Sequence, residues 1–280
     1  MTIKNELLEL TQRVSRYFTI PPVRRVFIPE PDPGPDKNTE FGILALEDGS
    51  AGLYYAWLGA SQQGMSRRFP ALDVSGRDVL SLVRYFASAD EAECSLGMAA
   101  INAITQSAFR RAAYVPAPAG DSLGSLDIRT GDHIGMVGYF PSLVRRLRER
   151  GLRVTVIEKK EKFLGTEGTV TVVTDPTRLR ECNKVLCTAA TLLNNSIDAI
   201  LEHLADAEAV VVVGPTAGFF PDPLFARGVT AVGGTQILDA DTAIDRLQSN
   251  EKMGASARKY IIRREEYPGV EQLLNNINKG

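Results

Sequence analysis

Residues 131–160 contain the glycines, the proline and the acid of a turn that could bind an anion or a nucleotide. Gly135 and Gly138 have no side chains that would keep a ligand away from the backbone. Pro141 suits the first turn of a helix, and the positive end of a helix attracts anions. Glu158 follows Gly138 by 20 residues. Dinucleotide-binding proteins often have an acidic residue at this distance, and its carboxylate binds a hydroxyl of the ribose. The pattern predicts a ligand site at this turn.

The glycine pattern is an incomplete dinucleotide fingerprint. From Gly135 the sequence reads G-x-x-G-x-x-P, which lacks the third glycine that lets helix and strand pack closely. Tyr139, directly after Gly138, belongs to the same turn. Two interpretations stay open: the turn holds a nucleotide or an S-adenosylmethionine-like cofactor, or it is a tight structural turn without a ligand.

Two further polar turns follow apolar runs at 185–191 and 210–213, which are predicted to be buried strands. The turns comprise Asn194, Asn195 and Ser196, and Gly214, Pro215 and Thr216. Ligands of open α/β sheets bind outside the carboxyl ends of the strands, so we expect all three turns to meet in one crevice. The alternative is that the asparagine turn is a helix cap, with Ser196 as N-cap, and that the proline turn is a rigid loop.

Proton carriers are few near these turns. Amide and hydroxyl side chains orient a carboxylate or a phosphate well but are poor general bases at neutral pH. Glu158 and Asp222 are the nearest candidates for moving a proton.

Nitrogen and sulfur ligands for a metal are scarce. The chain has two histidines, His133 and His203, and three cysteines, Cys94, Cys182 and Cys187. A zinc site usually needs three or four such ligands close together. Cys187 falls within an apolar run and is expected to be a small buried hydrophobe. Any metal is therefore expected to have oxygen ligands or to arrive within an organic chelator.

The sequence predicts two domains joined by a linker. Residues 116–127 are rich in Pro, Gly and Ser and separate a domain at 1–115 from one at 128–280. The first reads as an α+β unit: a helix near 3–14, strands at 23–28, 41–46 and 52–58, an irregular proline-rich segment at 30–36, and helices near 79–86 and 91–109. The second alternates strands with helices, with strands at 134–137, 153–157 and 170–174 before the two above, which predicts a parallel α/β sheet.

Composition excludes several classes of protein. The chain has 280 residues, of which 44% are hydrophobic and 24% charged, and its net charge of −2 gives no basic surface for nucleic acid. Three cysteines are too few for a secreted disulfide framework. Residues 1–12 have helical rather than signal-peptide character, and no apolar run reaches membrane-spanning length. We expect a cytoplasmic protein without membrane insertion, and a homodimer because symmetric dimers are common.

Several ordered motifs resemble one known family. They are GMAAINAI near Asn102 and GMVGYFP, LLNNSIDAIL, VVVVGPTAGFFPDPLF and GVTAVGGTQILDAD in the second half. They resemble the family called "putative heavy-metal chelation domain", or domain of unknown function 364. The resemblance implies an enolase-N-terminal-like domain followed by a Rossmann-like domain, with a site in the cleft between them. Asn102 and the turns around Gly138, Asn195 and Gly214 would line that cleft.

Two classes of function follow from the resemblance and the turns together. In the first, the protein binds a small anionic molecule in the interdomain cleft, with a metal ion or a metal chelate as the implied cofactor and a role in heavy-metal chelation. In the second, it is an enzyme acting on such a molecule, with Glu158 as proton carrier and a nucleotide or S-adenosylmethionine-like cofactor at the Gly135 to Gly138 turn.

Overall fold

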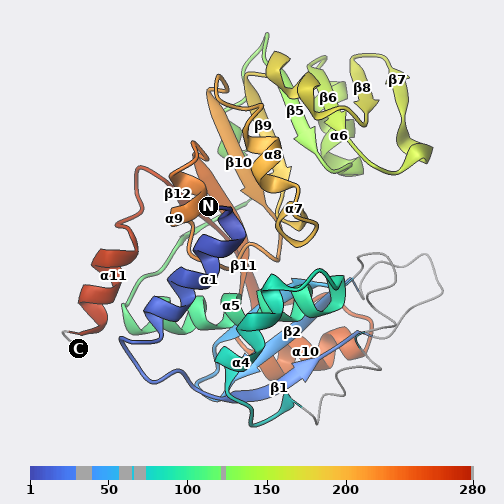
Figure 1. The fold of residues 1–280 in the computed structure, drawn as a ribbon. Helices are drawn as coiled ribbons and strands as arrows, with labels where there is room; N and C mark the ends of the chain where they lie inside the picture. Colours follow the sequence, from blue (N-terminus) through green and yellow to red (C-terminus); the bar gives the residue numbers. More distant parts are fainter. Residues whose placement is uncertain (30–39, 57–64, 66–73, 121–123, 279–280) are drawn as a thin grey trace.

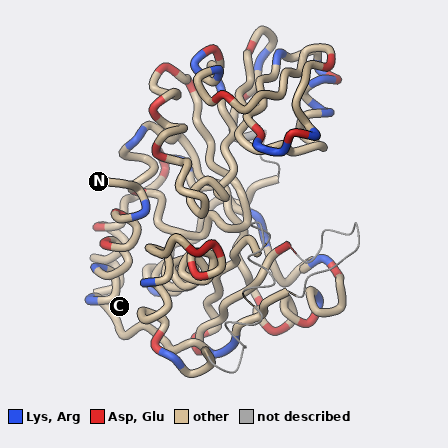
Figure 2. The backbone as a smooth tube through the Cα atoms, turned by 45° about the vertical axis from the view of Figure 1, so that its right-hand side comes forward, with Lys and Arg blue, Asp and Glu red and all other residues tan. Residues whose placement is uncertain are grey.

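The computed structural model describes residues 1–29, 40–56, 65, 74–120 and 124–278, which form two β-sheets surrounded by helices. Figure 1 shows the large sheet in the upper part of the molecule and the small sheet in the lower part. Basic and acidic residues are interspersed over both parts (Figure 2). None of the described helices is long and apolar enough to cross a membrane.

Nine strands form the large sheet, in the order β4-β12-β11-β10-β9-β5-β6-β8-β7. Six neighbouring strands are parallel: β5 (His133–Val137), β6 (Arg153–Ile157), β8 (Val170–Val173), β9 (Lys184–Thr188), β10 (Ala209–Val213) and β11 (Ala231–Ile237). Antiparallel strands finish both edges: β12 (Ala257–Arg263), β4 (Ala117–Pro118) and β7 (Gly165–Glu167). The central strands are almost wholly buried, as their unbroken apolar runs predicted.

The two faces of the large sheet are covered unequally. One face belongs to a large core that also includes residues of the small sheet. The helices of this core include α1 (Ile3–Val14), α5 (Glu91–Arg111), α7 (Ala190–Leu193), α8 (Ile197–Leu201), α9 (Asp222–Phe225) and α11 (Val270–Ile277). The other face packs against α6 (Pro141–Glu149), through Val144 and Leu147, and against the 3-10 helix at Gly124–Leu126. Among the described residues, α6 is the only α-helix that contributes to this second core.

The small sheet consists of β1 (Val23–Phe27), β2 (Phe41–Leu46) and β3 (Ala51–Tyr55), all antiparallel. Helix α4 (Val79–Val83) continues into a 3-10 helix at Arg84–Ala87 and leads to α5. Small residues bring α5 close to its neighbours. A Cβ on Gly52 of β3 would clash with the α5 backbone, and one on Gly97 of α5 would clash with the backbone of Phe86. Glycine at these two positions therefore permits the close contacts of α5 with β3 and with the preceding 3-10 helix.

Helix α10 (Ala240–Gln248) links β11 to β12 but packs on the small sheet (Figure 1). Its Ala243, Ile244 and Leu247 form one core with Ile43 and Leu53. A helix between neighbouring strands of a doubly wound fold ordinarily covers that sheet. Here α10 leaves the large sheet, and the second face over β10, β11 and β12 has no α-helix among the described residues.

Most predicted elements match the structure within a few residues. The helices at 3–14 and 91–109, the strand at 41–46 and most strands of the second half are confirmed. The strand predicted at 185–191 ends at Thr188, because residues from Ala190 form α7. Residues 30–36 and the last two residues of the strand predicted at 52–58 lie outside the described residues. The partition into two domains and a linker stays a prediction.

Candidate functional site

Three strand ends of the parallel sheet lie side by side. A Cβ on Gly138, after β5, would meet the side chain of Thr188, at the end of β9. A Cβ on Gly214, after β10, would meet Ala189. The turns after β5, β9 and β10 are therefore neighbours, as the expected crevice requires.

The Gly138 turn is closed by Glu158. Gly138 has φ +90°, a conformation that favours glycine, and its N–H donates to the carbonyl of Ile157. The carboxylate of Glu158 accepts hydrogen bonds from the backbone N–H groups of Tyr139 (3.0 Å), Lys159 (2.8 Å) and Lys160 (3.0 Å). Glu158 thus has the predicted place beside the turn, but its oxygens are already bound by the backbone.

Gly135 lies in the middle of β5 and not in the turn. A Cβ there would press against Leu179, Cys182 and Val185. Its small size therefore serves packing between the sheet and the 3-10 helix at Pro176–Glu181. The structure does not bring Gly135 to the strand ends.

The asparagine turn lies beyond α7, next to the N-terminal helix. Asn195 (φ +58°) accepts a hydrogen bond from Lys4 Nζ at 2.9 Å, and Asn194 accepts bonds from the N–H and the hydroxyl of Ser196. Ser196 has the predicted N-cap position of α8, but its side chain makes no capping hydrogen bond to that helix. At the crevice, β9 ends at Thr188 and Ala189 follows it. The sequence pattern did not reveal this end because it predicted a strand that continues to residue 191, where the structure has α7.

The loop after β10 is held by three buried side chains. Asn102 Nδ2 donates to the carbonyl of Thr216 at 2.7 Å and also to that of Leu53 in β3 at 2.8 Å. Tyr260 Oη donates to the carbonyl of Ala217 at 3.0 Å, and Gln106 Nε2 to that of Gly218 at 3.2 Å. Asn102 is 1% exposed, so it contacts the loop and not open solvent.

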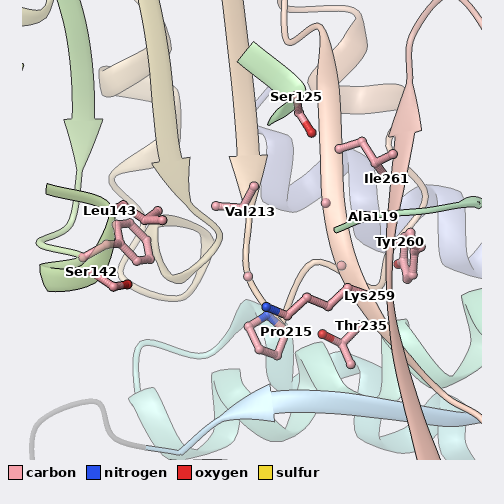
Figure 3. Close-up of a pocket in the computed structure, with 14 residues that line it drawn as sticks. Ala119, Ser125, Ser142, Leu143, Val213, Pro215, Thr235, Lys259, Tyr260 and Ile261 are labelled. Atoms are coloured by element: carbon pink, nitrogen blue, oxygen red, sulfur yellow. The ribbon is translucent and has the colours of Figure 1, made fainter. Parts of the chain in front are cut away.

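A cavity of about 280 Å³ opens on the second face of the large sheet, where α10 leaves it uncovered (Figure 3). Its wall combines the start of α6, the loop after β10, β11 and β12. The lining of the cavity includes Phe140, Ser142, Leu143, Gly214, Pro215, Thr235 and Lys259, with Ser125 at one side. Two predicted site residues, Gly214 and Pro215, therefore line this pocket.

Lys259 is the only charged residue that lines the pocket, among the described residues. It is exposed, no described carboxylate pairs with it, and in Figure 3 its amine points toward Pro215. Hydroxyls of Ser142, Thr235 and Ser125 share the cavity, while Phe140 and Leu143 provide an apolar side. A cation with hydroxyl donors and no carboxylate favours an anionic ligand. Lys259 belongs to no motif that would have identified it as a site residue from the sequence.

Comparison with known proteins gives the family. A family model described as "Putative heavy-metal chelation" (DUF364) matches residues 121–265, more than half of the chain. The chain belongs to the DUF364 family. An uncharacterized protein of Methanocaldococcus jannaschii is 30% identical to this DUF364 protein over 179 residues, which are 62% of this chain and 68% of that protein.

Two solved structures of DUF364 proteins with unknown function share the fold. The one from Pyrococcus horikoshii aligns with a TM-score of 0.67 at 19% identity, over 92% of this chain and 99% of its own. The one from Desulfitobacterium hafniense aligns with a TM-score of 0.63 at 21% identity, over 93% of this chain and 99% of its own. All pocket-lining residues except Ala119 lie within the family match.

The thiols of this DUF364 protein do not fit a soft-metal site. All three cysteines are buried, and burial raises the pKa of Cys94, that of Cys182 to about 11 and that of Cys187 to about 12. Metals bind the thiolate, which these environments disfavour. In the part of the chain that the structure describes, no group of three or more His, Cys, Asp or Glu side chains could hold a metal ion.

The histidines do not supply a site either. His133 Nε2 lies 2.8 Å from the hydroxyl of Thr155, and burial lowers its pKa. It begins β5, at the end of the strand away from the Gly138 turn. The family description therefore does not correspond to a side-chain metal centre among the described residues.

Proposed function

We propose that this protein binds a small organic anion, such as the carboxylate groups of a metal chelate, in the pocket between α6 and strands β10 to β12. The observation that carries the proposal is Lys259, an unpaired cation in a cavity lined by hydroxyls and no described carboxylate. A charge-assisted hydrogen bond from such an ammonium is stronger than a neutral one. The apolar wall formed by Phe140 and Leu143 would contact the carbon skeleton of the ligand.

A chelate reconciles this pocket with the family description. Because the described cysteines and histidines are unsuited to soft metals, the ligand would bring its own donor atoms and the protein would recognise the anionic shell. The ion is then cargo held by the organic ligand. The role of the protein in heavy-metal chelation would be to deliver or sequester this metal–ligand complex.

We also propose a Rossmann-like second domain and a ligand site facing the first. Numbered along the chain, the six parallel strands have the order 3-2-1-4-5-6, which dinucleotide-binding sheets share. Ribbons of the N-terminal half run just below Pro215 and Thr235 in Figure 3, which supports a site near the cleft between the halves. The enolase-N-terminal-like nature of residues 1–115 remains a proposal from the family resemblance. A cytoplasmic location remains a proposal from composition, and a homodimer one from the frequency of symmetric dimers.

The second candidate, an enzyme with a nucleotide or S-adenosylmethionine-like cofactor at the Gly138 turn, has weaker support. Strand order and the place of Glu158 favour it, but Glu158 already accepts three backbone N–H groups. The space beside Gly135 is filled by packing side chains. A ribose hydroxyl would have to compete with these backbone N–H groups for the Glu158 carboxylate.

Calorimetric titration with citrate, nickel citrate and inorganic phosphate tests the proposal. We expect binding of citrate or its nickel chelate, weakened about tenfold or more in Lys259→Met, since a hydrogen bond to a charged group contributes about 1.5–3 kcal/mol. Lys252→Met, which removes an exposed lysine outside the pocket, is the matched control.

The outcomes separate the candidates. If the wild type binds none of the three probes, or if both lysine variants bind alike, the anion proposal is wrong. Tighter binding of nickel citrate than of citrate supports a chelate as the ligand. Binding of NAD or S-adenosylmethionine that is lost in Glu158→Ala would favour the second candidate.

A further inference from the structure

Three consecutive carbonyls of the loop after β10 each accept a hydrogen bond from a buried side chain. The carbonyls belong to Thr216, Ala217 and Gly218, and the donors are Asn102, Tyr260 and Gln106 in the same order. Two donors come from α5 and one from β12. The same loop begins with Gly214 and Pro215, which line the pocket. Residues far apart in the sequence thus determine where the pocket wall lies.

The α5 amides make these bonds at a cost. Asn102 Oδ1 and Gln106 Oε1 are buried without a hydrogen-bond partner. A buried acceptor that loses its water without gaining a donor destabilises the folded state. An apolar residue at either position would avoid this penalty but could not hold a loop carbonyl. The amide N–H groups of Asn102 and Gln106 therefore hold the loop carbonyls while their own oxygens stay without a donor.

Close packing leaves the loop little freedom. A Cβ on Gly218 would touch Asn102, and one on Gly234 of β11 would clash with Ala217 and Tyr260. Tyr260 is itself 1% exposed, and its strand neighbour Lys259 carries the charge of the pocket. A change in the loop is therefore transmitted to the wall formed by Gly214 and Pro215.

We propose that Asn102 and Gln106 are positioning residues that make the affinity of the pocket depend on the packing of α5. This inference rests on the proposed function for its ligand, but the loop contact itself does not. Asn102 bridges β3 and the loop with a single amide group, so movement of the N-terminal half changes the loop. Because coupling is reciprocal, a bound anion would also stabilise the contact between α5 and the loop.

Hydrogen exchange and citrate titration of three variants test the inference. The variants are Asn102→Ala, Gln106→Ala and, as matched control, Thr105→Ala. Thr105 lies between the two amides on α5 and is fully buried, but its hydroxyl bonds to Ile101 of its own helix. We expect amide exchange in residues 214–220 to rise about fivefold or more in the two amide variants, with β5 as an internal reference. Citrate affinity should fall about tenfold in both and stay near wild type in the control.

Each result decides a separate question. Unchanged exchange of 214–220 in both amide variants overturns the inference, and so does faster exchange with unchanged citrate affinity. Equal loss of affinity in Thr105→Ala shows a general effect of α5 stability and also overturns it. If Asn102→Ala does not fold, Gln106→Ala alone provides the test, because it keeps the hydrogen bond from Asn102 to β3. Failure of the wild type to bind citrate counts against the proposed function, and the exchange data then decide the loop contact alone.

Discussion

Thr235 on β11 lies directly opposite Lys259 on β12 in the antiparallel register. Residues that face each other in this way project from the same side of a sheet. The hydroxyl and the ammonium therefore share one wall of the pocket, and Figure 3 shows both beside Pro215. This pairing places a cation and a hydrogen-bond donor within reach of one anionic group.

Thr235→Val tests that pairing, because valine keeps the shape of the side chain but has no hydroxyl. We expect citrate affinity to fall about three- to tenfold, as for loss of a hydrogen bond contributing about 1 kcal/mol. Thr166→Val on β7, outside the pocket, is the control. Unchanged citrate affinity in Thr235→Val would show that the Thr235 hydroxyl does not contribute to ligand binding.

Gly234→Ala is expected to damage the fold and the pocket together. The new Cβ would lie too close to the Ala217 carbonyl and the Tyr260 ring, so the strand or the loop must move. Overpacking of this kind costs about 1–3 kcal/mol. Gly120→Ala, whose Cβ meets nothing within 4 Å, should change the free energy of unfolding by less than about 0.5 kcal/mol. Urea unfolding of both variants measures the difference.

The buried ion pair between Asp132 and Lys184 predicts a specific acid response. The atoms Asp132 Oδ2 and Lys184 Nζ are 2.9 Å apart, and the side chains are 10% and 5% exposed. Burial raises the pKa of Asp132. Hydrogen bonds from Arg129, Asn183 and Lys184, together with the Lys184 charge, outweigh burial and lower that pKa from 3.8 to about 2.

Because the folded state holds this carboxylate ionised below pH 3.8, its contribution to stability is full above that pH and is lost as the pH falls toward about 2. Asp132→Asn should flatten the pH dependence of the unfolding free energy in this window. At pH 7 it should cost about 3 kcal/mol, since Lys184 is left buried without its partner. Asp241→Asn, which removes an exposed partner of Arg24, should cost less than about 1 kcal/mol. Equal slopes in wild type and Asp132→Asn would contradict the assignment.

Metal removal should leave the fold unchanged. The described residues hold no cluster of metal ligands, so dialysis against EDTA is expected to leave the thermal midpoint within error. A thiol reagent should label Cys94, Cys182 and Cys187 only after unfolding, because all three are buried. Stoichiometric metal that survives purification and disappears in Cys182→Ser would overturn this prediction.

Local sequence patterns predicted the strands and long helices well. The apolar runs at 134–137 and 210–213 are short and flanked by turn residues, which favours buried strands, and the apolar residues from Ile3 to Val14 recur at helical spacing. Patterns failed where two conformations compete within a few residues. The apolar run from Val185 leaves the strand after Thr188 and continues into α7. Ser196 is at the N-cap position of α8, but its hydroxyl bonds to Asn194 and not to the helix.

The pocket could not be read from any local pattern, because its parts are separated in the chain and joined by pairing and packing. Gly214 and Pro215 stood out as turn residues, but Lys259 belongs to a strand without a motif and becomes a pocket residue through its register with Thr235. The cavity exists because α10 packs on the small sheet and leaves β10 to β12 uncovered on one face. Short-range propensity specifies the elements. The long-range packing of α10 on the small sheet, through burial of Ala243, Ile244 and Leu247, decides which part of the large sheet stays uncovered.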